Sequence, residues 1–189
     1  MKKIKFIIFF VVYLISLLTY SNLMAFEESA YKVINKTDTY EIRQYTDRLA
    51  VQAQLSNEDS SFRKLFNYIS GANLSSKKID MTTPVTQTGK ENGLFMQFYL
   101  PSNFDKKTIP IPSNPDVEIV TMKGGYFAVI KYSGRSSDKN FVNHSKILKE
   151  KLLEDKIKIK GPPIKATYNG PFTLPAFRRN EAMYNIEWN

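Results

Sequence analysis

The sequence predicts an α+β domain in which a distorted antiparallel β-barrel or sheet is flanked by two helices. Three observations lead to this prediction. Most of the chain alternates polar and apolar residues with the period of β-strands, and only two segments have the spacing of an amphipathic helix. Each helix-like segment lies between strand-like segments, which is typical of an α+β fold. The same order of segments occurs in both halves of the chain, so we interpret the domain as two duplicated β-α-β halves.

The first 25 residues have the layout of a secretory signal peptide. Three lysines within the first five residues precede an apolar run from Phe6 to Leu18, and Ala25 is a small residue suited to the position before cleavage. If it is not cleaved, the apolar segment 6–24 would act as a membrane anchor. We therefore expect an exported protein, periplasmic or secreted, or one anchored through its N-terminus. The domain is expected in residues 26–189, a length that fits one core.

The first half of the domain is predicted to contain a helix between two groups of strands. Apolar residues between 62 and 69 recur at helical spacing, with Ser56 or Asp59 as candidate N-terminal caps and Gly71 at the end. The alternation that is typical of strands occurs in residues 31–36, 40–45, 49–55, 84–88 and 94–100.

The second half repeats this order, with one helix predicted over residues 138–154. Its strands are predicted at residues 117–122, 126–132, 164–168 and 182–188. An overlay of the halves pairs Glu41 with Glu118, Ala50-Val51 with Ala128-Val129, and the strand at Met96 with the strand at Met183. A duplicated fold leaves a groove where its halves meet, and ligands commonly bind in such grooves.

Composition excludes several classes of function. The formal net charge is +9, but the lysines and arginines are scattered and match no nucleic-acid-binding signature, so we expect no nucleic acid partner. The absence of cysteine excludes disulfides, thiolate metal ligands and cysteine nucleophiles. The motifs of hydrolases, zinc proteases and nucleotide-binding enzymes are missing as well. Glu41 and Glu118 could form a catalytic pair of carboxylates or could be exposed strand charges; we favour the second and expect a protein that is not an enzyme.

Two segments are more distinctive than the rest: Lys77-Lys-Ile-Asp-Met-Thr-Thr-Pro-Val85 and Asn169-Gly-Pro-Phe-Thr-Leu-Pro-Ala-Phe-Arg-Arg-Asn-Glu181. Together with Tyr-Glu-Ile-Arg at residues 40–43, they resemble the SOUL family of haem-binding proteins, and the resemblance extends over residues 31–188. It implies a duplicated α+β fold that binds haem or another porphyrin, in some members without a fixed axial ligand. The implied function is transport, buffering or sensing of a tetrapyrrole. The alternative is a protein-interaction or membrane-associated module that retains the fold without haem.

The resemblance also implies which residues bind the tetrapyrrole. Lys78, Ile79 and Met81 would belong to one wall of the pocket, with Ile79 and Met81 against the ring. Phe172, Leu174, Arg178 and Arg179 would come from the second loop, with the arginines near the edge of the ring. Methionine packs well against π-systems, and arginine can pair with a propionate through two hydrogen bonds. Each assignment has a structural alternative: Met81 could be a core residue, and an arginine could pair with Glu181 to fix the loop.

The only histidine is His144, on the border of the apolar stripe of the helix predicted at 138–154. Haem iron is commonly bound by histidine, methionine or tyrosine, so His144 is the candidate axial ligand. A half-exposed helix residue without a role in metal binding is the favoured alternative, and any of the eleven tyrosines could serve instead. The metal ligand therefore stays open, as do the protein partners.

Overall fold

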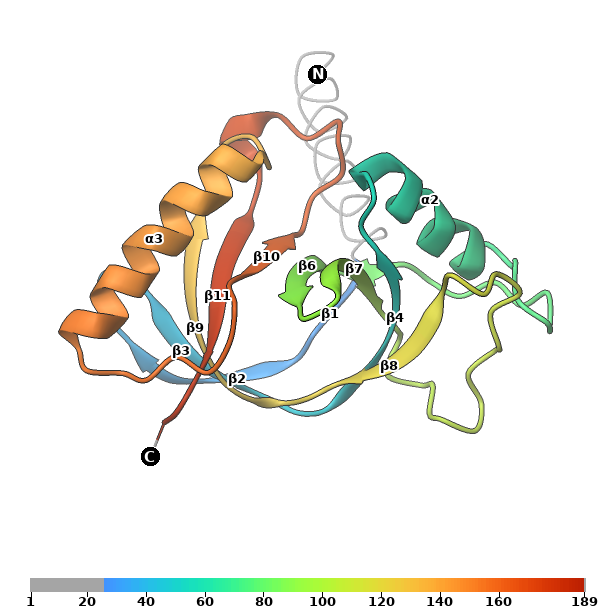
Figure 1. The fold of residues 1–189 in the computed structure, drawn as a ribbon, viewed down its shortest axis with the longest axis horizontal. Helices are drawn as coiled ribbons and strands as arrows, with labels where there is room; N and C mark the ends of the chain where they lie inside the picture. Colours follow the sequence, from blue (N-terminus) through green and yellow to red (C-terminus); the bar gives the residue numbers. More distant parts are fainter. Residues whose placement is uncertain (1–25, 189) are drawn as a thin grey trace, which may run out of the picture.

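Residues 26–188 are described by a computed structural model (Figure 1). They form a curled, nine-stranded antiparallel sheet with two α-helices on its outer side, which confirms the predicted α+β class. The predicted signal peptide lies outside the described residues. Within them, neither helix is both long and apolar enough to cross a membrane.

The strands of the sheet follow the order β2-β3-β9-β11-β10-β6-β7-β4-β8, and a separate parallel pair is formed by β1 and β5. The strands are β1 (Glu27–Glu28), β2 (Tyr31–Lys36), β3 (Glu41–Tyr45), β4 (Arg48–Gln54), β5 (Thr82–Thr83), β6 (Val85–Lys90), β7 (Gly93–Tyr99), β8 (Glu118–Met122), β9 (Gly125–Tyr132), β10 (Ile164–Thr167) and β11 (Asn180–Ile186). The helices are α2 (Glu58–Ile69), α3 (Asp138–Glu154) and the short 3-10 helix η1 (Pro175–Phe177).

The helices start where local capping satisfies their first backbone N–H groups. The side chain of Ser137 accepts a hydrogen bond from the Asn140 backbone and so starts α3 at the predicted position. Helix α2 is capped by Asn57, which lies between the two predicted candidates Ser56 and Asp59 and accepts a hydrogen bond from the Ser60 N–H at 2.7 Å.

The order of the strands agrees with the proposed duplication, which itself remains a prediction. After β2 at one edge, the order is β3, β9, β11 and β10; from the other edge it is β8, β4, β7 and β6. The strand with Met96 and the strand with Met183 thus occupy matching places in the two orders, which is compatible with the overlay. The pairing of Ala50-Val51 with Ala128-Val129 is wrong by one residue, because the two valines face opposite sides of the sheet. Val51 packs beneath α2, whereas Val129 faces the inner side of the sheet.

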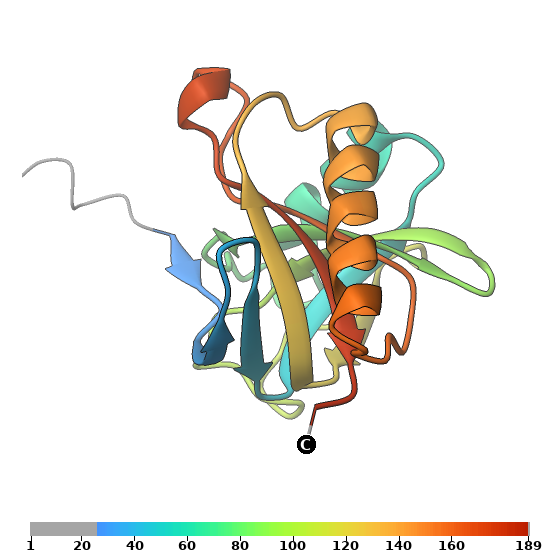
Figure 2. The ribbon, with the colours of Figure 1, turned by 90° about the vertical axis from the view of Figure 1, so that its left-hand side faces the viewer.

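Each helix covers its own core on the outer side of the sheet. Helix α2 packs Leu65 and Tyr68 against β4 and β7, and the Tyr68 hydroxyl donates a hydrogen bond to the Pro110 carbonyl at 2.8 Å. Helix α3 packs Leu148 and Leu152 against β9 and β11. Figure 2 shows the helix lying along these strands. A third, smaller apolar cluster lies on the inner side of the curl and includes Phe127, Val129 and Met183. No helix of residues 26–188 covers this inner face, so it is open to a ligand.

One lysine connects the two helices. Lys165 lies on β10 with its side chain only 3% exposed, and its Nζ is 3.0 Å from Asp138 in the first turn of α3. The same Nζ is 3.7 Å from Glu58 in the first turn of α2. A lysine this deeply buried requires charged partners, and here they come from both halves of the domain.

Candidate functional site

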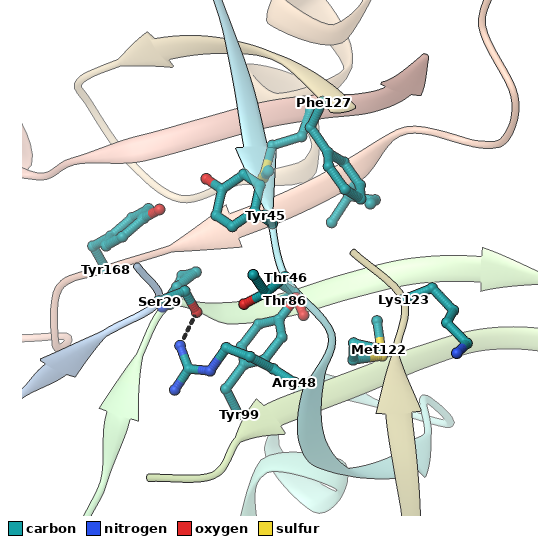
Figure 3. A pocket seen from close by; sticks show the side chains of 13 residues that line it. Ser29, Tyr45, Thr46, Arg48, Thr86, Tyr99, Met122, Lys123, Phe127 and Tyr168 are labelled. Carbon is teal, nitrogen blue, oxygen red and sulfur yellow. Dashed lines mark hydrogen bonds between the residues drawn. The ribbon is translucent and has the colours of Figure 1, made fainter. Parts of the chain in front are cut away.

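An apolar cavity lies on the inner side of the curled sheet (Figure 3). Strands from both halves contribute to its walls, and the Tyr45 and Phe127 rings meet edge to face at 5.5 Å between centroids. The free volume is only about 40 Å³, far below the roughly 300–1,000 Å³ of pockets that hold small-molecule ligands. The lining side chains are Ser29, Tyr45, Thr46, Arg48, Pro84, Thr86, Tyr99, Met122, Lys123, Phe127, Ile164, Tyr168 and Met183.

Residues 27–30, which we call the strap, close one side of this cavity. The Ser29 backbone N–H donates a hydrogen bond to the Thr83 carbonyl at 3.2 Å, beside the parallel pairing of β1 with β5. The buried Ser29 hydroxyl accepts a hydrogen bond from Arg48, which stacks on the Tyr99 ring at 5.3 Å. Through Ser29, the strap thus forms part of the cavity wall.

A larger, open groove of about 660 Å³ lies on the other side of the strap. It shares Thr46, Arg48 and Lys123 with the inner cavity. The rest of its lining is Glu27, Glu28, Ala30, Asp47, Leu49, Leu100, Pro101, Ser102, Phe104, Asp105, Lys106 and Thr121. Because the two hollows share three residues and the strap lies between them, displacement of the strap would join them.

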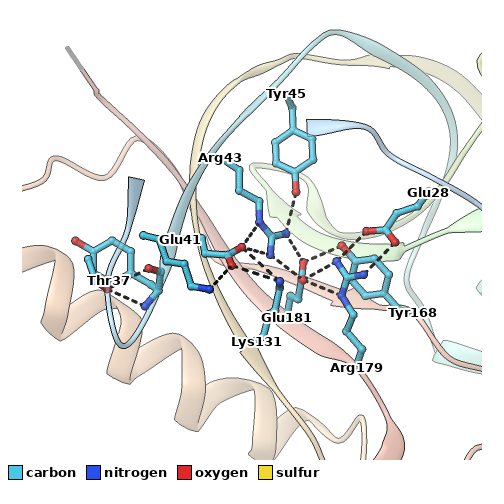
Figure 4. A network of polar contacts seen from close by, with 11 residues as sticks. Glu28, Thr37, Glu41, Arg43, Tyr45, Lys131, Tyr168, Arg179 and Glu181 are labelled. Atoms are coloured by element: carbon cyan, nitrogen blue, oxygen red, sulfur yellow. Dashed lines mark hydrogen bonds and ion pairs between the residues drawn. The ribbon is translucent and has the colours of Figure 1, made fainter. Parts of the chain in front are cut away.

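A network of charged side chains lies beside the cavity and centres on Glu181 (Figure 4). Glu181 is fully buried and accepts two hydrogen bonds from Arg43, at 3.0 and 3.1 Å. Arg179 donates two more, at 3.0 and 2.9 Å, and the Tyr168 hydroxyl donates one at 2.8 Å. Such charge-assisted bonds satisfy the buried carboxylate and fix the side chains around it.

The tyrosines of the cavity keep their protons. Burial raises the pKa of Tyr45, Tyr99 and Tyr168, and for Tyr168 the negative charge of Glu181 raises it further. Arg43 acts against this shift at Tyr45 without cancelling it. At neutral pH these side chains are therefore neutral phenols, which act as hydrogen-bond donors and apolar walls.

The predicted residues of the first loop lie at different depths. Ile79 is buried in the core beneath α2, and Met81 packs partly buried against the same core, so the two share one face of the segment as expected. This placement agrees with the structural alternative for Met81. Lys78 is exposed. A contact between any of these residues and a ligand stays a prediction.

The arginines of the second loop have structural roles. Arg178 donates hydrogen bonds to the carbonyls of Thr173 and Pro171, at 2.8 and 2.6 Å, and so fixes the loop around η1. Arg179 pairs with Glu181, as the alternative interpretation expected, and stacks on the Tyr168 ring at 3.7 Å. Arg179 also pairs with Glu28 of the strap at 2.8 Å.

The two predicted loops lie at the same end of the molecule, and the strap connects them. Glu28 is the β-sheet partner of Thr83 and at the same time the ion-pair partner of Arg179. In contrast, Phe172 and Leu174 do not line the cavity. Their exposed fractions are 98% and 65%, and that of Phe177 in η1 is 76%. Apolar side chains of the second loop therefore point to solvent at the tip of that loop.

His144 lies away from the cavity, on the helix-covered side of the sheet. Its ring stacks on Tyr132 at 4.1 Å between centroids, and its Nδ1 is 2.8 Å from the Asn140 carbonyl. Among residues 26–188, no three or more His, Cys, Asp or Glu side chains are grouped to hold a metal ion. Axial ligation by His144 stays a prediction.

Glu41 and Glu118, considered above as a pair of carboxylates, belong to separate contacts. Glu41 is 2.8 Å from Arg43 and 3.4 Å from Lys131. Its pKa is lowered, because these cations outweigh the effect of burial. Glu118 instead accepts a hydrogen bond from Gln52 at 2.8 Å.

Sequence reasoning missed most of the cavity. Tyr45 and Phe127 were assigned to strands but not to a site, since alternation does not say which side of a strand faces a ligand. Arg48 and Ser29 gave no signal, because single polar residues at the ends of strands are common. The segment Tyr-Glu-Ile-Arg at residues 40–43 contributed only to the family resemblance. Its two charged residues share one face of β3 and pair with each other, which was not predicted from the sequence.

Taken together, these features define an α+β half-barrel with an inner apolar cavity. The chain belongs to the SOUL heme-binding protein family, whose pattern it matches over residues 26–185. Among solved structures, the C-terminal domain of EcmrR is similar, with a TM-score of 0.58, 13% identity, and coverage of 83% of this chain and 98% of that chain. A hydrolase from Listeria innocua gives a TM-score of 0.56 and 9% identity, with coverage of 82% and 94%. At such identities only the fold is shared. No curated protein matches the chain.

Proposed function

We propose that the protein binds haem or another tetrapyrrole on the inner side of the sheet, beneath the strap. The observation that carries the proposal is the aromatic and apolar lining of the inner cavity, in a chain of a haem-binding family. Arg48 belongs to this lining, and Arg179 stacks on Tyr168, which also lines the cavity. The proposed role is transport, buffering or sensing of the tetrapyrrole, without catalysis, in the periplasm or outside the cell.

The residues present fit a porphyrin in chemistry. A porphyrin ring has two large apolar faces, which aromatic side chains and methionine contact well. Tyr45, Phe127 and Met183 offer such surfaces. Arginine is the side chain best suited to propionate carboxylates. The free volume of about 40 Å³ does not fit the ring, so the strap has to move before a tetrapyrrole can enter.

The lining also favours binding without a fixed axial ligand. No histidine lines the cavity, and the raised pKa values of Tyr45 and Tyr168 disfavour the phenolate that would bind iron. Haem supplies the iron and its redox chemistry. The side chains of the protein would hold the ring through its faces and its carboxylates.

Hemin titration with a blocked cavity tests the site. Thr46 is exposed and lines both hollows, so Thr46→Trp would fill the space between them without disturbing the core. We expect hemin affinity to fall at least about tenfold, because roughly 1.4 kcal/mol of lost contact is sufficient for this change. The measurement is the Soret band of hemin during titration of the protein.

The matched control is Ser75→Trp, which adds the same indole to an exposed loop beyond α2. It should leave hemin binding unchanged. If Thr46→Trp binds hemin as tightly as the unmodified protein, the inner cavity is not the site. If the unmodified protein gives no saturable Soret shift, tetrapyrrole binding itself is contradicted.

The exposed tip of the second loop favours a second candidate, association with a membrane. Phe172, Leu174 and Phe177 expose apolar surface within six residues. Each large apolar side chain gains roughly 1.5–3 kcal/mol when it leaves water completely, and the positive net charge of the chain would attract anionic lipids.

Vesicle sedimentation checks this second candidate. The variant with Phe172→Asp and Phe177→Asp is expected to lose most of its binding to vesicles that contain anionic lipid. Val142→Asp, on the exposed face of α3, should retain it. Equal binding by both variants would exclude the loop as a membrane contact.

A further inference from the structure

The strap carries two carboxylates, and each is paired with an arginine of the domain. Glu27 Oε1 lies 3.3 Å from Arg48 Nη2. Glu28 Oε1 lies 2.8 Å from Arg179 Nη2, and its second oxygen accepts a hydrogen bond from Nη1 at 3.0 Å. The two arginines come from different halves of the domain, Arg48 from β4 and Arg179 from the segment before β11. The strap therefore presents two acids to two arginines beside the cavity.

Within residues 26–188, the strap makes few other contacts. Its β-sheet pairing with β5 covers two residues, and Ser29 adds one backbone hydrogen bond and the hydrogen bond that its hydroxyl accepts from Arg48. Glu27 also accepts a hydrogen bond from the Ser102 backbone at 3.0 Å. The side chains of Glu27 and Glu28 are more than a third exposed, and exposed ion pairs typically contribute about 0–1 kcal/mol each. Among the described residues, the closed position is therefore held by a small number of contacts, of which the two exposed ion pairs are weak.

We propose that the strap is a built-in competitor of the ligand. In the closed state, Glu27 and Glu28 occupy the two arginine subsites that receive the two carboxylates of a bound ligand. The ligand class is a flat apolar molecule with two carboxylates, and this inference rests on the proposed function, since the propionate-bearing tetrapyrroles belong to that class. Binding displaces the strap, joins the two hollows and exchanges one pair of carboxylates for another.

The exchange provides selectivity. When the strap leaves, Arg48 and Arg179 lose their partners on the strap. A ligand with two carboxylates restores both pairs, whereas a neutral ligand of the same shape leaves the arginines without them. The strap thus lowers the affinity for every ligand. For ligands that carry carboxylates, new ion pairs with the two arginines offset this loss.

Titration with two porphyrins tests both claims: that the strap competes with the ligand, and that the arginines select ligands with carboxylates. The probes are mesoporphyrin IX, which has two carboxylates, and its dimethyl ester, which has none, and binding is followed by the quenching of Trp188 fluorescence. The first variant carries both Glu27→Gln and Glu28→Gln, which weaken the closed position of the strap. Both probes should then bind about three- to tenfold more tightly, as expected when two exposed ion pairs are lost. The preference for the dicarboxylate over the ester should stay the same.

A substitution of Arg48 should change the preference between the two porphyrins, which the substitutions in the strap leave unchanged. Arg48→Gln leaves the hydrogen bonds of Glu181 intact and is expected to reduce the preference for the dicarboxylate by about tenfold, the effect of one lost charge-assisted contact. Glu91→Gln and Arg63→Gln are the controls, because both residues are exposed and line neither hollow. They should change neither affinity nor preference.

A reversible lock tests the movement of the strap. The chain has no cysteine, and Glu28 and Thr83 are partners in a parallel pair, so Glu28→Cys with Thr83→Cys would form the only disulfide. The oxidised protein should bind neither porphyrin, and reduction should restore binding.

The outcomes separate this inference from the proposed function. Equal binding by the oxidised and reduced forms, or no effect of the glutamine substitutions in the strap, would overturn the inference while tetrapyrrole binding stands. An unchanged preference in Arg48→Gln would overturn the arginine subsite. If no form of the protein bound either porphyrin, the proposed function and this inference would both be wrong.

Discussion

Replacing Glu181 by glutamine is expected to destabilise the domain by about 3 kcal/mol, because it removes the charge that two arginines share in a buried site. Arg43 is fully buried, and it would keep only Glu41 as a charged partner. Arg179 would keep Glu28. The glutamine has nearly the same shape, so the loss reports the charge and its hydrogen bonds rather than a cavity.

Urea unfolding of the Glu181→Gln protein, followed by circular dichroism, measures this effect as a lower midpoint at an unchanged slope. Glu91→Gln, which removes an exposed carboxylate from the β6–β7 turn, is the control and should change the stability by less than about 0.5 kcal/mol. A loss below about 1 kcal/mol in Glu181→Gln would show that the charge network contributes little to the fold.

Replacing Gly124 by alanine is expected to have a comparably large effect, on the order of 3 kcal/mol, because the added methyl group has no space. A Cβ at this position would lie 2.3 Å from the Tyr45 carbonyl oxygen and 2.6 Å from the Thr46 carbonyl carbon. Both atoms belong to backbone, so the turn between β8 and β9 would have to move away from the turn between β3 and β4. The Gly124 N–H would then lose its hydrogen bond to Asp47, now 2.9 Å.

Thermal unfolding compares this variant with Gly161→Ala, where a Cβ meets no atom within 4 Å. The Gly161 variant should keep its melting temperature, whereas Gly124→Ala should melt several degrees lower. Since Thr46 lines both hollows, Gly124→Ala should also alter hemin binding. Equal melting temperatures for the two variants would show that the turns are not in tight contact.

The fold could be predicted from the sequence where periodicity was strong. The helical stripe containing Leu148 gave the bounds of α3, and the alternation of residues 126–132 gave most of β9. The first residue of a helix was harder to predict. Several polar residues before α2 could act as its cap, and only Asn57 has the required geometry. β1 could not be predicted, since two residues have no measurable period.

The site was only partly predictable, for a physical reason. The family resemblance drew attention to the two loops, which the strap does bring together. A buried core residue such as Ile79 and an apolar residue that lines a cavity have the same hydrophobic character, so the sequence cannot separate them. The ion pair between Glu28 and Arg179 joins residues 151 positions apart and leaves no local signal in either segment.

Lys165 has a consequence for how the domain unfolds. Its ammonium group is shared by the first turns of α2 and α3, and its side chain has almost no access to water. If either helix detached, the remaining acid would have to compensate the buried charge alone. Loss of one helix therefore weakens the attachment of the other. This coupling favours cooperative unfolding of the whole domain over separate unfolding of its two halves.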